Sequence, residues 1–244
     1  MQSKHPEIGD AFGNMLWDAY CYEMNMDEII ETRSGDIWAN YHGTAMYFAP
    51  YAQWSSHEKT AIAHMKGTVL DIGCGAGRHS LYAQSLGHDV TAIDSSWLAT
   101  EVARLRGVKQ KEWLSIERAE ELGEGRFDTV LLLGNGLGLL GNHTKARRLL
   151  KMLYKSTTPG GIIIGESKDP EHIRKDLLGK ATTRSKLQGQ IRLRVRYRNM
   201  TTPWFNYCYL SPKELEEMIR GTGWVVREKI RGRKGVYVVV LAKK

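Results

Sequence analysis

The chain has 244 residues, of which 42% are hydrophobic and 25% are charged, and its formal net charge is +8. This composition predicts a globular protein with a sizeable core and excludes an intrinsically disordered chain. Its three cysteines, Cys21, Cys74 and Cys208, are scattered, so neither a disulfide framework nor a metal site is expected. A reducing compartment, most simply the cytoplasm, suits such a chain.

The pattern predicts neither a membrane span nor a secretory signal. No apolar run approaches the roughly 20 residues that cross a bilayer. The first residues carry Glu7, Asp10 and Asp18, unlike a secretory signal. The net positive charge leaves nucleic acid open as a partner. The basic residues are spread out, however, apart from residues 192–198 and 227–234, so a small-molecule partner is favoured.

Residues 1–65 are predicted to form an N-terminal cover of helices and aromatic side chains. Apolar residues at helical spacing predict a helix over residues 6–32. Residues 33–36 read Arg-Ser-Gly-Asp and predict a turn, which could close a small hairpin. An aromatic-rich stretch follows, and Ser55 with Glu58 then predicts a capping box that opens a helix to about Met65.

Strands and helices alternate after this cover. The predicted strands cover residues 68–72, 88–93, 111–116, 127–133 and 162–165, and the predicted helices cover residues 76–86, 97–106 and 144–155. This alternation predicts an α/β fold with a doubly wound, mainly parallel sheet. Residues 127–133 are apolar throughout, as a central parallel strand should be.

The C-terminal third is predicted to add a hairpin and a final strand pair. Residues 190–198 alternate between an apolar face and an arginine face, which predicts a half-buried strand. Residues 202–210 could pair back on it, which would make residues 186–210 an inserted β-hairpin. Ser211 then predicts a capped helix. Residues 224–230 and 235–242 predict a closing antiparallel pair, which ends the domain of residues 66–244.

The most informative segment is residues 69–79, which read VLDIGCGAGRH. Apolar β-formers, an acid and three alternate glycines predict a buried strand that turns sharply into a helix over a ligand. A dinucleotide fingerprint needs its third glycine where this chain has Arg78. Asp71 would repel a pyrophosphate but suits a ligand with an ammonium group. S-adenosylmethionine (SAM) is such a ligand, with an ammonium, a sulfonium and no phosphate.

The run VLDIGCGAG and the later VTAID at residues 90–94 resemble motif I and the next acidic position of class I SAM-dependent methyltransferases. The resemblance covers residues 66–170 well and the C-terminal part more loosely. It implies a seven-stranded, Rossmann-like sheet and a methyltransferase activity that releases S-adenosylhomocysteine (SAH). The alternatives are a nucleotide-binding dehydrogenase and a domain whose glycine turn is only a tight connection.

The cofactor is expected at the carboxyl ends of the strands, near the switch in strand order. Asp71 should attract the methionine ammonium, directly or through water. Asp94, at the end of the second strand, should accept both ribose hydroxyls. The other expected contacts lie on the glycine turn and just after Asp94, namely Gly73, Cys74, Gly75, Gly77 and Ser95.

Two later segments are also implied as cofactor contacts by the resemblance. The family has an acid that holds the adenine amino group, and Arg118 stands in its place here. We therefore expect the Ala119 backbone to meet the ring, with Glu117 or Glu120 as support. Gly134 and Asn135, after the fourth strand, are similar to the Leu-Gly-Asn run of some small-molecule methyltransferases.

Methyl transfer demands mainly alignment and the exclusion of water, so the sequence need not contain a catalytic cluster, and none is recognised. Asn135, Glu166 and Tyr47 are the candidates, with Glu166 as a base or a substrate clamp. The expected substrate contacts are aromatic residues of the cover and the insertion, namely Tyr41, Tyr47, Tyr51, Trp54 and Trp204. These rings could instead form a second core.

The arginine face of residues 192–198 has three interpretations. It could be a solvated strand face, it could bind an anionic small substrate through Arg192 and Arg194, or it could follow a phosphate backbone. We therefore expect a SAM-dependent methyltransferase that acts on a small molecule. An RNA or protein methyltransferase that uses the arginine strand, and a SAM-binding module without catalysis, remain alternatives. Both a monomer and a homodimer are open.

Overall fold

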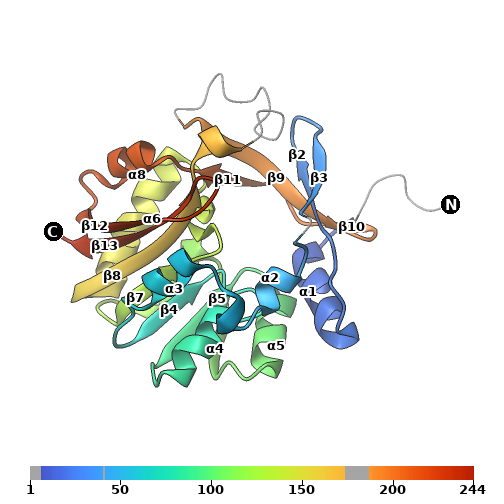
Figure 1. Cartoon of the computed structure of the whole chain (residues 1–244), viewed down its shortest axis with the longest axis horizontal. Helices are drawn as coiled ribbons and strands as arrows, with labels where there is room; N and C mark the ends of the chain where they lie inside the picture. Colours follow the sequence, from blue (N-terminus) through green and yellow to red (C-terminus); the bar gives the residue numbers. More distant parts are fainter. Residues whose placement is uncertain (1–6, 41, 174–186) are drawn as a thin grey trace.

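The computed structural model describes residues 7–40, 42–173 and 187–244 and shows two β-sheets that face each other (Figure 1). The larger sheet has seven strands in the order β12-β13-β8-β7-β4-β5-β6. All neighbours are parallel except that β13 runs antiparallel to both β8 and β12. The strands are β4 (Val69–Ile72), β5 (Val90–Asp94), β6 (Gln110–Trp113), β7 (Phe127–Leu132), β8 (Thr157–Lys168), β12 (Trp224–Arg231) and β13 (Val236–Lys243).

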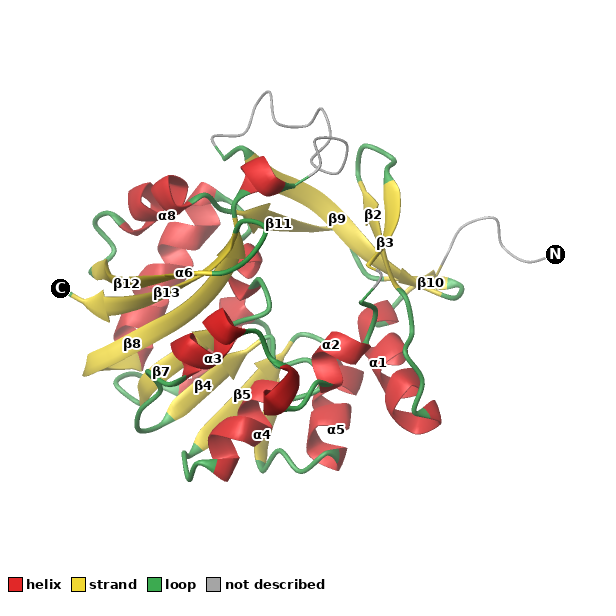
Figure 2. Cartoon of the chain, in the orientation of Figure 1, coloured by secondary structure: helices red, strands yellow, loops and turns green. Residues whose placement is uncertain are grey.

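Helices pack on both faces of this sheet (Figure 2), which confirms the predicted doubly wound α/β fold. Buried residues alternate between the two faces: Val130 and Leu132 of β7 join one core cluster, whereas Leu131 joins the other. The helices are α3 (Ser56–Ile62), α4 (Arg78–Ser85), α5 (Trp97–Leu105), α6 (His143–Ser156) and α8 (Pro212–Ile219). Within the described ranges, no helix combines the length and apolarity that crossing a bilayer requires.

The smaller sheet joins the start of the chain to its C-terminal third. Its strand order is β1-β10-β9-β2-β3, and β11 also pairs with β9. Arg196 pairs with Ile29 of β2, and Leu193 pairs with Phe205 of β11. The strands are β1 (Glu7–Ile8), β2 (Glu28–Thr32), β3 (Ile37–Asn40), β9 (Gly189–Tyr197), β10 (Met200–Thr201) and β11 (Phe205–Tyr209).

The predicted helix over residues 6–32 is too long. Helix α1 (Ala11–Tyr22) ends where Glu23 takes a left-handed conformation with φ 52°, and residues 28–32 form β2 instead. This strand lies between β3 and β9, so its backbone hydrogen bonds come from neighbours on both sides. A partner more than 160 residues away therefore decides the conformation of this segment, and helical periodicity cannot reveal it. The N-terminal cover is thus part helix and part sheet.

Two other local predictions need correction. Ser55 does begin α3, but it makes no side-chain cap, and the predicted partner Glu58 binds Arg78 and His79 of α4 instead. Strand β8 starts at Thr157 rather than at residue 162. The ladder between β7 and β8 shifts register after Phe127, which accommodates the Pro-Gly-Gly run of residues 159–161 inside the strand.

Other local predictions are confirmed. The turn at residues 33–36 closes the β2–β3 hairpin, with the Thr32 amide donating to the Asp36 carbonyl at 2.9 Å. Ser211 and Glu214 form the capping box of α8. The short α2 (Ala45–Phe48) follows β3, and its side chains lie near the glycine turn.

Candidate functional site

A cavity of about 610 Å³ lies between the carboxyl ends of the main-sheet strands and the smaller sheet. Its main-sheet wall comes from the segments that follow β4, β5, β6 and β7, which is where open α/β sheets bind ligands. Its opposite wall comes from α1, α2, β9 and the β10–β11 segment. A volume of this size is typical of a small-molecule site.

The glycine turn after β4 forms part of the floor. Gly73, Gly75 and Gly77 have φ values of 71°, 53° and 77°, a backbone conformation that residues other than glycine rarely adopt. A Cβ on Gly75 would lie 3.2 Å from Cδ1 of Tyr47, so the Tyr47 ring rests directly on the turn. A Cβ on Gly77 would lie 2.7 Å from Cγ2 of Val108, so this glycine permits close packing behind the turn.

The two predicted carboxylates occupy different places. Asp94 lines the cavity, with its Oδ2 accepting from the Gly75 amide at 3.0 Å and its Oδ1 accepting from the Ser96 amide at 2.9 Å. Asp71 lies behind the turn, where its Oδ2 accepts from the Ser80 hydroxyl at 2.6 Å. Asp71 therefore supports the strand-to-helix connection and is not part of the cavity wall.

Asp94 is the polar group that best defines the kind of ligand that fits. It is only 7% exposed, and burial raises the pKa of its carboxyl to about 6, although the amides of Ser96 and Gly75 oppose this shift. A buried carboxylate gains stability from further hydrogen-bond donors. The two hydroxyls of a ribose are such donors, so the residues present fit a nucleoside.

The segment after β6 contributes one side of the cavity. Its wall is formed by residues 113–117, and Trp113 is held there by a hydrogen bond from its Nε1 to the Ser95 carbonyl at 2.9 Å. Glu117 lies in this wall and pairs with Lys145 of α6, which holds the pKa of the Glu117 carboxyl low despite the opposing effect of burial. Ala119 is buried outside the wall and Glu120 is exposed, so neither reaches the cavity.

The turn after β7 carries Gly134 and Asn135. Gly134 lines the cavity, whereas Asn135 is held in a left-handed conformation at its edge. The Asn135 amide donates to Oε1 of Glu166 at 2.9 Å, and its Nδ2 donates to the Tyr207 hydroxyl at 3.0 Å, which donates back to the Asn135 carbonyl at 2.9 Å. The side-chain Oδ1 of Asn135 is buried and has no partner among the described residues.

Residues 69–161 match a family model described as a methyltransferase domain. A solved SAM-dependent methyltransferase from Bacteroides fragilis, in complex with S-adenosyl-L-homocysteine, aligns with a TM-score of 0.81 and 27% identity over 96% of this chain and 94% of that one. Residues 69–161 therefore form a methyltransferase domain, and the chain has the class I SAM-dependent methyltransferase fold. The cofactor of that family is SAM, whose ribose hydroxyls are hydrogen-bond donors of the kind that Asp94 suits.

Curated relatives of this chain include the glycine N-methyltransferase of Rattus norvegicus, which is 26% identical over 60% of this chain and 55% of that protein. The glycine/sarcosine N-methyltransferase of Halorhodospira halochloris is 30% identical over 43% of this chain and 41% of that protein. The chain therefore spans about half the length of the curated relatives it matches.

The methyltransferase fold brings only part of the expected substrate set to the cavity. Tyr47 lines it, and its hydroxyl donates to Oε1 of Glu28 at 3.0 Å. Trp54 is 5% exposed in a core cluster, and Tyr51 stacks on Tyr82 at 4.2 Å. The alternative of a second core therefore describes Trp54 better, whereas Tyr51 is 38% exposed and lies outside both the core and the cavity wall. Tyr41 lies outside the described residues.

The arginines of β9 lie on the side of the strand that faces away from the cavity, because its neighbour Val195 lines the wall. Arg194 forms two hydrogen bonds to Glu31 at 2.9 and 3.0 Å and lies 4.6 Å from the centre of the Trp204 ring. Arg192 is exposed. Arg192 and Arg194 do not line the cavity, because the pleat places them on the opposite face of β9. Trp204, in the loop before β11, lies against Arg194 and does not line the cavity either.

Several wall residues escaped the sequence prediction. Asp10 accepts from the Gly13 amide in the first turn of α1. It also accepts from the Ser96 hydroxyl and from the Leu98 amide at the start of α5. An acid directly before an apolar helix is a detectable cap signal for α1. The contact of Asp10 with the start of α5 cannot be recognised in the sequence, because it joins residues more than 80 positions apart. Glu28, Phe12, Phe205 and Tyr207 also line the cavity. Glu166, the predicted base, lies behind the β7 turn and contacts its backbone.

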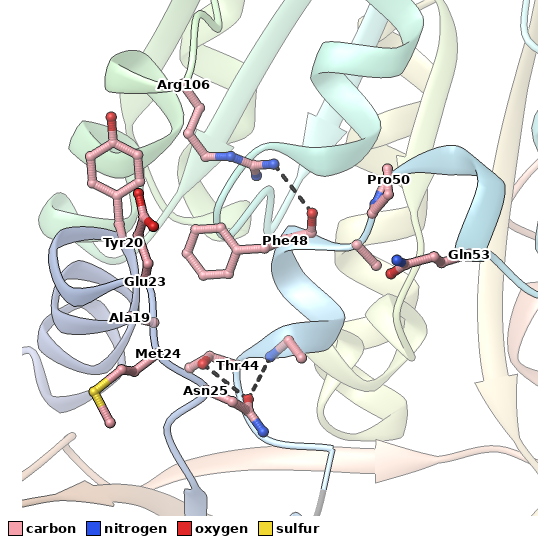
Figure 3. A pocket seen from close by; sticks show the side chains of 12 residues that line it. Ala19, Tyr20, Glu23, Met24, Asn25, Thr44, Phe48, Pro50, Gln53 and Arg106 are labelled. Carbon is pink, nitrogen blue, oxygen red and sulfur yellow. Dashed lines mark hydrogen bonds between the residues drawn. The ribbon is translucent and has the colours of Figure 1, made fainter.

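A second cavity of about 470 Å³ lies outside this site, between the end of α1 and the residues around α2 (Figure 3). At its edge Arg106 donates to the carbonyls of Ala76, Tyr47 and Phe48. The guanidinium thereby fastens α2, which carries Tyr47, to the glycine turn. This cavity contains none of the predicted cofactor contacts.

Proposed function

We propose that this protein transfers a methyl group from SAM to a small molecule held in the cavity between the two sheets, with SAH as the second product. The observation that carries the proposal is the position of Asp94, a buried cavity-wall carboxylate at the end of β5. SAM supplies a methyl group bonded to a positively charged sulfur when it is bound.

The protein's own residues supply binding and orientation. Asp94 would accept hydrogen bonds from the ribose hydroxyls, and the left-handed glycines of the turn would let the cofactor lie close to the backbone. The β9 and β10–β11 segments form the opposite wall, so an acceptor would be enclosed between two layers of protein. Enclosure excludes water and aligns the reacting atoms, which are the principal requirements of an in-line displacement.

A polymer substrate bound through the arginine strand receives less support. Arg194 and Arg196 share Glu31, and Arg198 pairs with Asp18, so much of the positive charge of this face is offset. The same arginines point away from the cavity. A phosphate backbone that lay on them would therefore not deliver a base to the proposed methyl donor.

Isothermal titration of the whole chain with SAM and SAH tests the proposal. We expect both to bind, and Asp94→Asn to weaken SAH binding about 10- to 100-fold, the effect of losing charged hydrogen bonds. Asp89→Asn is the matched control, because Asp89 is exposed at the other end of the same strand. Absence of SAM and SAH binding to the wild type would refute the proposal.

A SAM-binding module without catalysis predicts a different result. It would bind SAH with the same dependence on Asp94 but release no methyl group to any acceptor. Incubation with methyl-labelled SAM and a mixed set of amines, alcohols, thiols and carboxylates separates the two functions, since turnover requires label in a product other than SAM.

A further inference from the structure

The charged side chains in the cavity wall are mostly acidic. They are Asp10, Glu28, Asp94, Glu117 and Lys145. Lys145 pairs with Glu117, Asp10 caps two helices, and Asp94 suits the ribose hydroxyls. Glu28 differs from the other acids of this wall, because it pairs with no described cation, caps no helix and is not needed for the ribose hydroxyls.

Glu28 is 8% exposed and is held in place by neutral groups. Its Oε1 accepts from the Tyr47 hydroxyl and its Oε2 accepts from Nδ2 of Asn40, both at 3.0 Å. Among the described residues, no lysine, arginine or histidine nitrogen lies within the 4.0 Å of an ion pair with it. Each carboxylate oxygen can accept a second hydrogen bond, so Glu28 retains acceptor capacity that faces the cavity.

Burial without a cation is unfavourable for a carboxylate, and it raises the pKa of Glu28 despite the hydrogen bonds from Asn40 and Tyr47. The negative charge of Glu28 also raises the pKa of Tyr207 and Tyr209 on β11, although burial is the larger cause for both. Glu28, the first residue of β2, lines the cavity together with Tyr207 of β11 on the acceptor side.

Four aromatic rings line the same cavity as this carboxylate. Phe12 and Tyr47 meet edge to face with their centres 5.3 Å apart, and Phe205 and Tyr207 meet in the same way at 6.3 Å. Ring faces attract cations, and a carboxylate among them adds a directed hydrogen-bond acceptor.

We propose that the methyl acceptor is an amine and that the Glu28 carboxylate binds its nitrogen. This inference rests on the proposed function. An anionic acceptor does not suit this wall, because Lys145, the one cation among the described residues that line it, already pairs with Glu117 and the arginines of β9 face the other way. Glu28 is thus the residue that selects the acceptor class.

Glu28 also suits the movement of charge in the reaction. The lone pair of a neutral amine forms the new bond to the methyl carbon while the carbon–sulfur bond breaks, and that electron pair remains on sulfur as the neutral thioether. Positive charge passes from sulfur to nitrogen, and the N-methylammonium then releases one proton to water. A carboxylate that accepts from the N–H stabilises this nitrogen most as its charge develops.

The first test uses wild-type protein and acceptors that differ only in their head group. Benzyl, phenethyl and butyl bodies are each tested as the amine, the alcohol and the carboxylate, with methyl transfer from labelled SAM as the readout. We expect transfer to amines, at least tenfold faster than to the matched alcohol or carboxylate. Faster transfer to an alcohol or carboxylate, or no transfer to any amine by protein that binds SAH, would overturn the inference.

The second test uses Glu28→Gln, which keeps the shape and an acceptor for Tyr47. We expect kcat/KM for the best amine to fall at least tenfold, with the SAH dissociation constant changed less than twofold. Glu31→Gln is the control, since Glu31 lies on the same strand but pairs with Arg194 away from the cavity. If SAH affinity fell as much as kcat/KM for the amine, Glu28 would be a cofactor ligand and the inference would be wrong.

The two proposals fail in different ways. Wild-type protein that binds neither SAM nor SAH refutes the methyltransferase function itself. Wild-type protein that binds SAH and methylates only non-amine acceptors refutes the amine inference alone. The head-group comparison needs no variant, so it decides the question even where Glu28→Gln does not fold.

Discussion

The carboxylate of Glu166 accepts a hydrogen bond from the backbone amide of Asn135 at 2.9 Å. An acid near the end of β8 thus holds the turn that follows its neighbour β7, at the edge of the cavity. Because Glu166 contacts the backbone and does not line the cavity, it is better described as a positioning residue than as the predicted base. The ion pair of Glu58 and Arg78 lies close enough to influence the pKa of Glu166.

Glu166 should make stability depend on pH. Burial and the charge of Glu58 raise the pKa of Glu166 from 4.5 to about 7, so between these values the folded chain holds a proton that the unfolded chain has lost. The contribution of this group to stability is therefore present below pH 4.5 and is lost as the pH rises to about 7. Glu166→Gln should remove that loss. The unfolding free energy of the variant minus that of the wild type should therefore rise by about 1–3 kcal/mol from pH 5 to pH 8.

Urea unfolding at pH 5, 6, 7 and 8 measures this difference. Glu171→Gln is a suitable control, because Glu171 is exposed near the end of the same strand. A difference between Glu166→Gln and wild type that stays constant with pH would contradict the prediction.

Asp94 should make SAH binding depend on pH. Burial raises the pKa of Asp94 to about 6 in the free protein, and the ribose hydroxyls should bind its ionised form. The dissociation constant for SAH is expected to be constant above pH 7 and to rise up to about tenfold per pH unit well below pH 6. Isothermal titration from pH 5 to pH 8 measures it, and Asp94→Asn should abolish the dependence. A wild-type dissociation constant that is flat over this range would count against the role of Asp94.

Gly75→Ala should weaken cofactor binding more than its backbone strain explains. The new Cβ would meet the Tyr47 ring at 3.2 Å, in addition to the cost of φ 53°. Gly87→Ala is the matched control, since Gly87 has φ 88° and a Cβ there meets nothing within 4 Å. We expect the control to lose about 1 kcal/mol of unfolding free energy and to bind SAH normally, whereas Gly75→Ala binds SAH at least tenfold more weakly.

Arg106→Lys should loosen α2 from the glycine turn. The guanidinium donates to three carbonyls from two segments, of which Figure 3 shows that of Phe48, and a single ammonium group cannot reproduce that fork. Thermal unfolding should show a loss of about 1–3 kcal/mol. SAH binding should weaken several-fold, because Tyr47 is then less well held. Arg104→Lys, an exposed arginine of α5 paired with Glu101, should change neither quantity.

The amino-acid order alone predicts the segments whose structure depends on near neighbours. The strand–glycine turn–helix of residues 69–79 follows from local rules, because alternate glycines after an apolar strand permit few other conformations. The placement of Asp94 follows in the same way, since parallel strands that alternate with helices must end on one edge of a sheet. Strict alternation likewise predicted which face of β9 is buried.

The predictions for residues 28–32, Trp54 and Arg194 show where local rules end. Residues 28–32 look helical in isolation, yet they form a strand because β9 offers hydrogen bonds from a distant part of the chain. That pairing brings Glu28 to the acceptor side of the cavity and gives Arg194 a partner in Glu31. Periodicity could not separate an aromatic residue of the wall, such as Tyr47, from an aromatic residue of the core.

Local residue order was enough to predict the glycine turn after β4 and the position of Asp94 at the end of β5, because both depend on near neighbours in the chain. The surroundings of the acceptor, and the position of Asp71 behind the turn, depend on contacts between distant segments. The wall around the acceptor is assembled from α1, β2, β9 and β11, and β2 reaches it by pairing with β9 more than 160 residues away. The free energy of such contacts depends on the whole fold and not on any one segment.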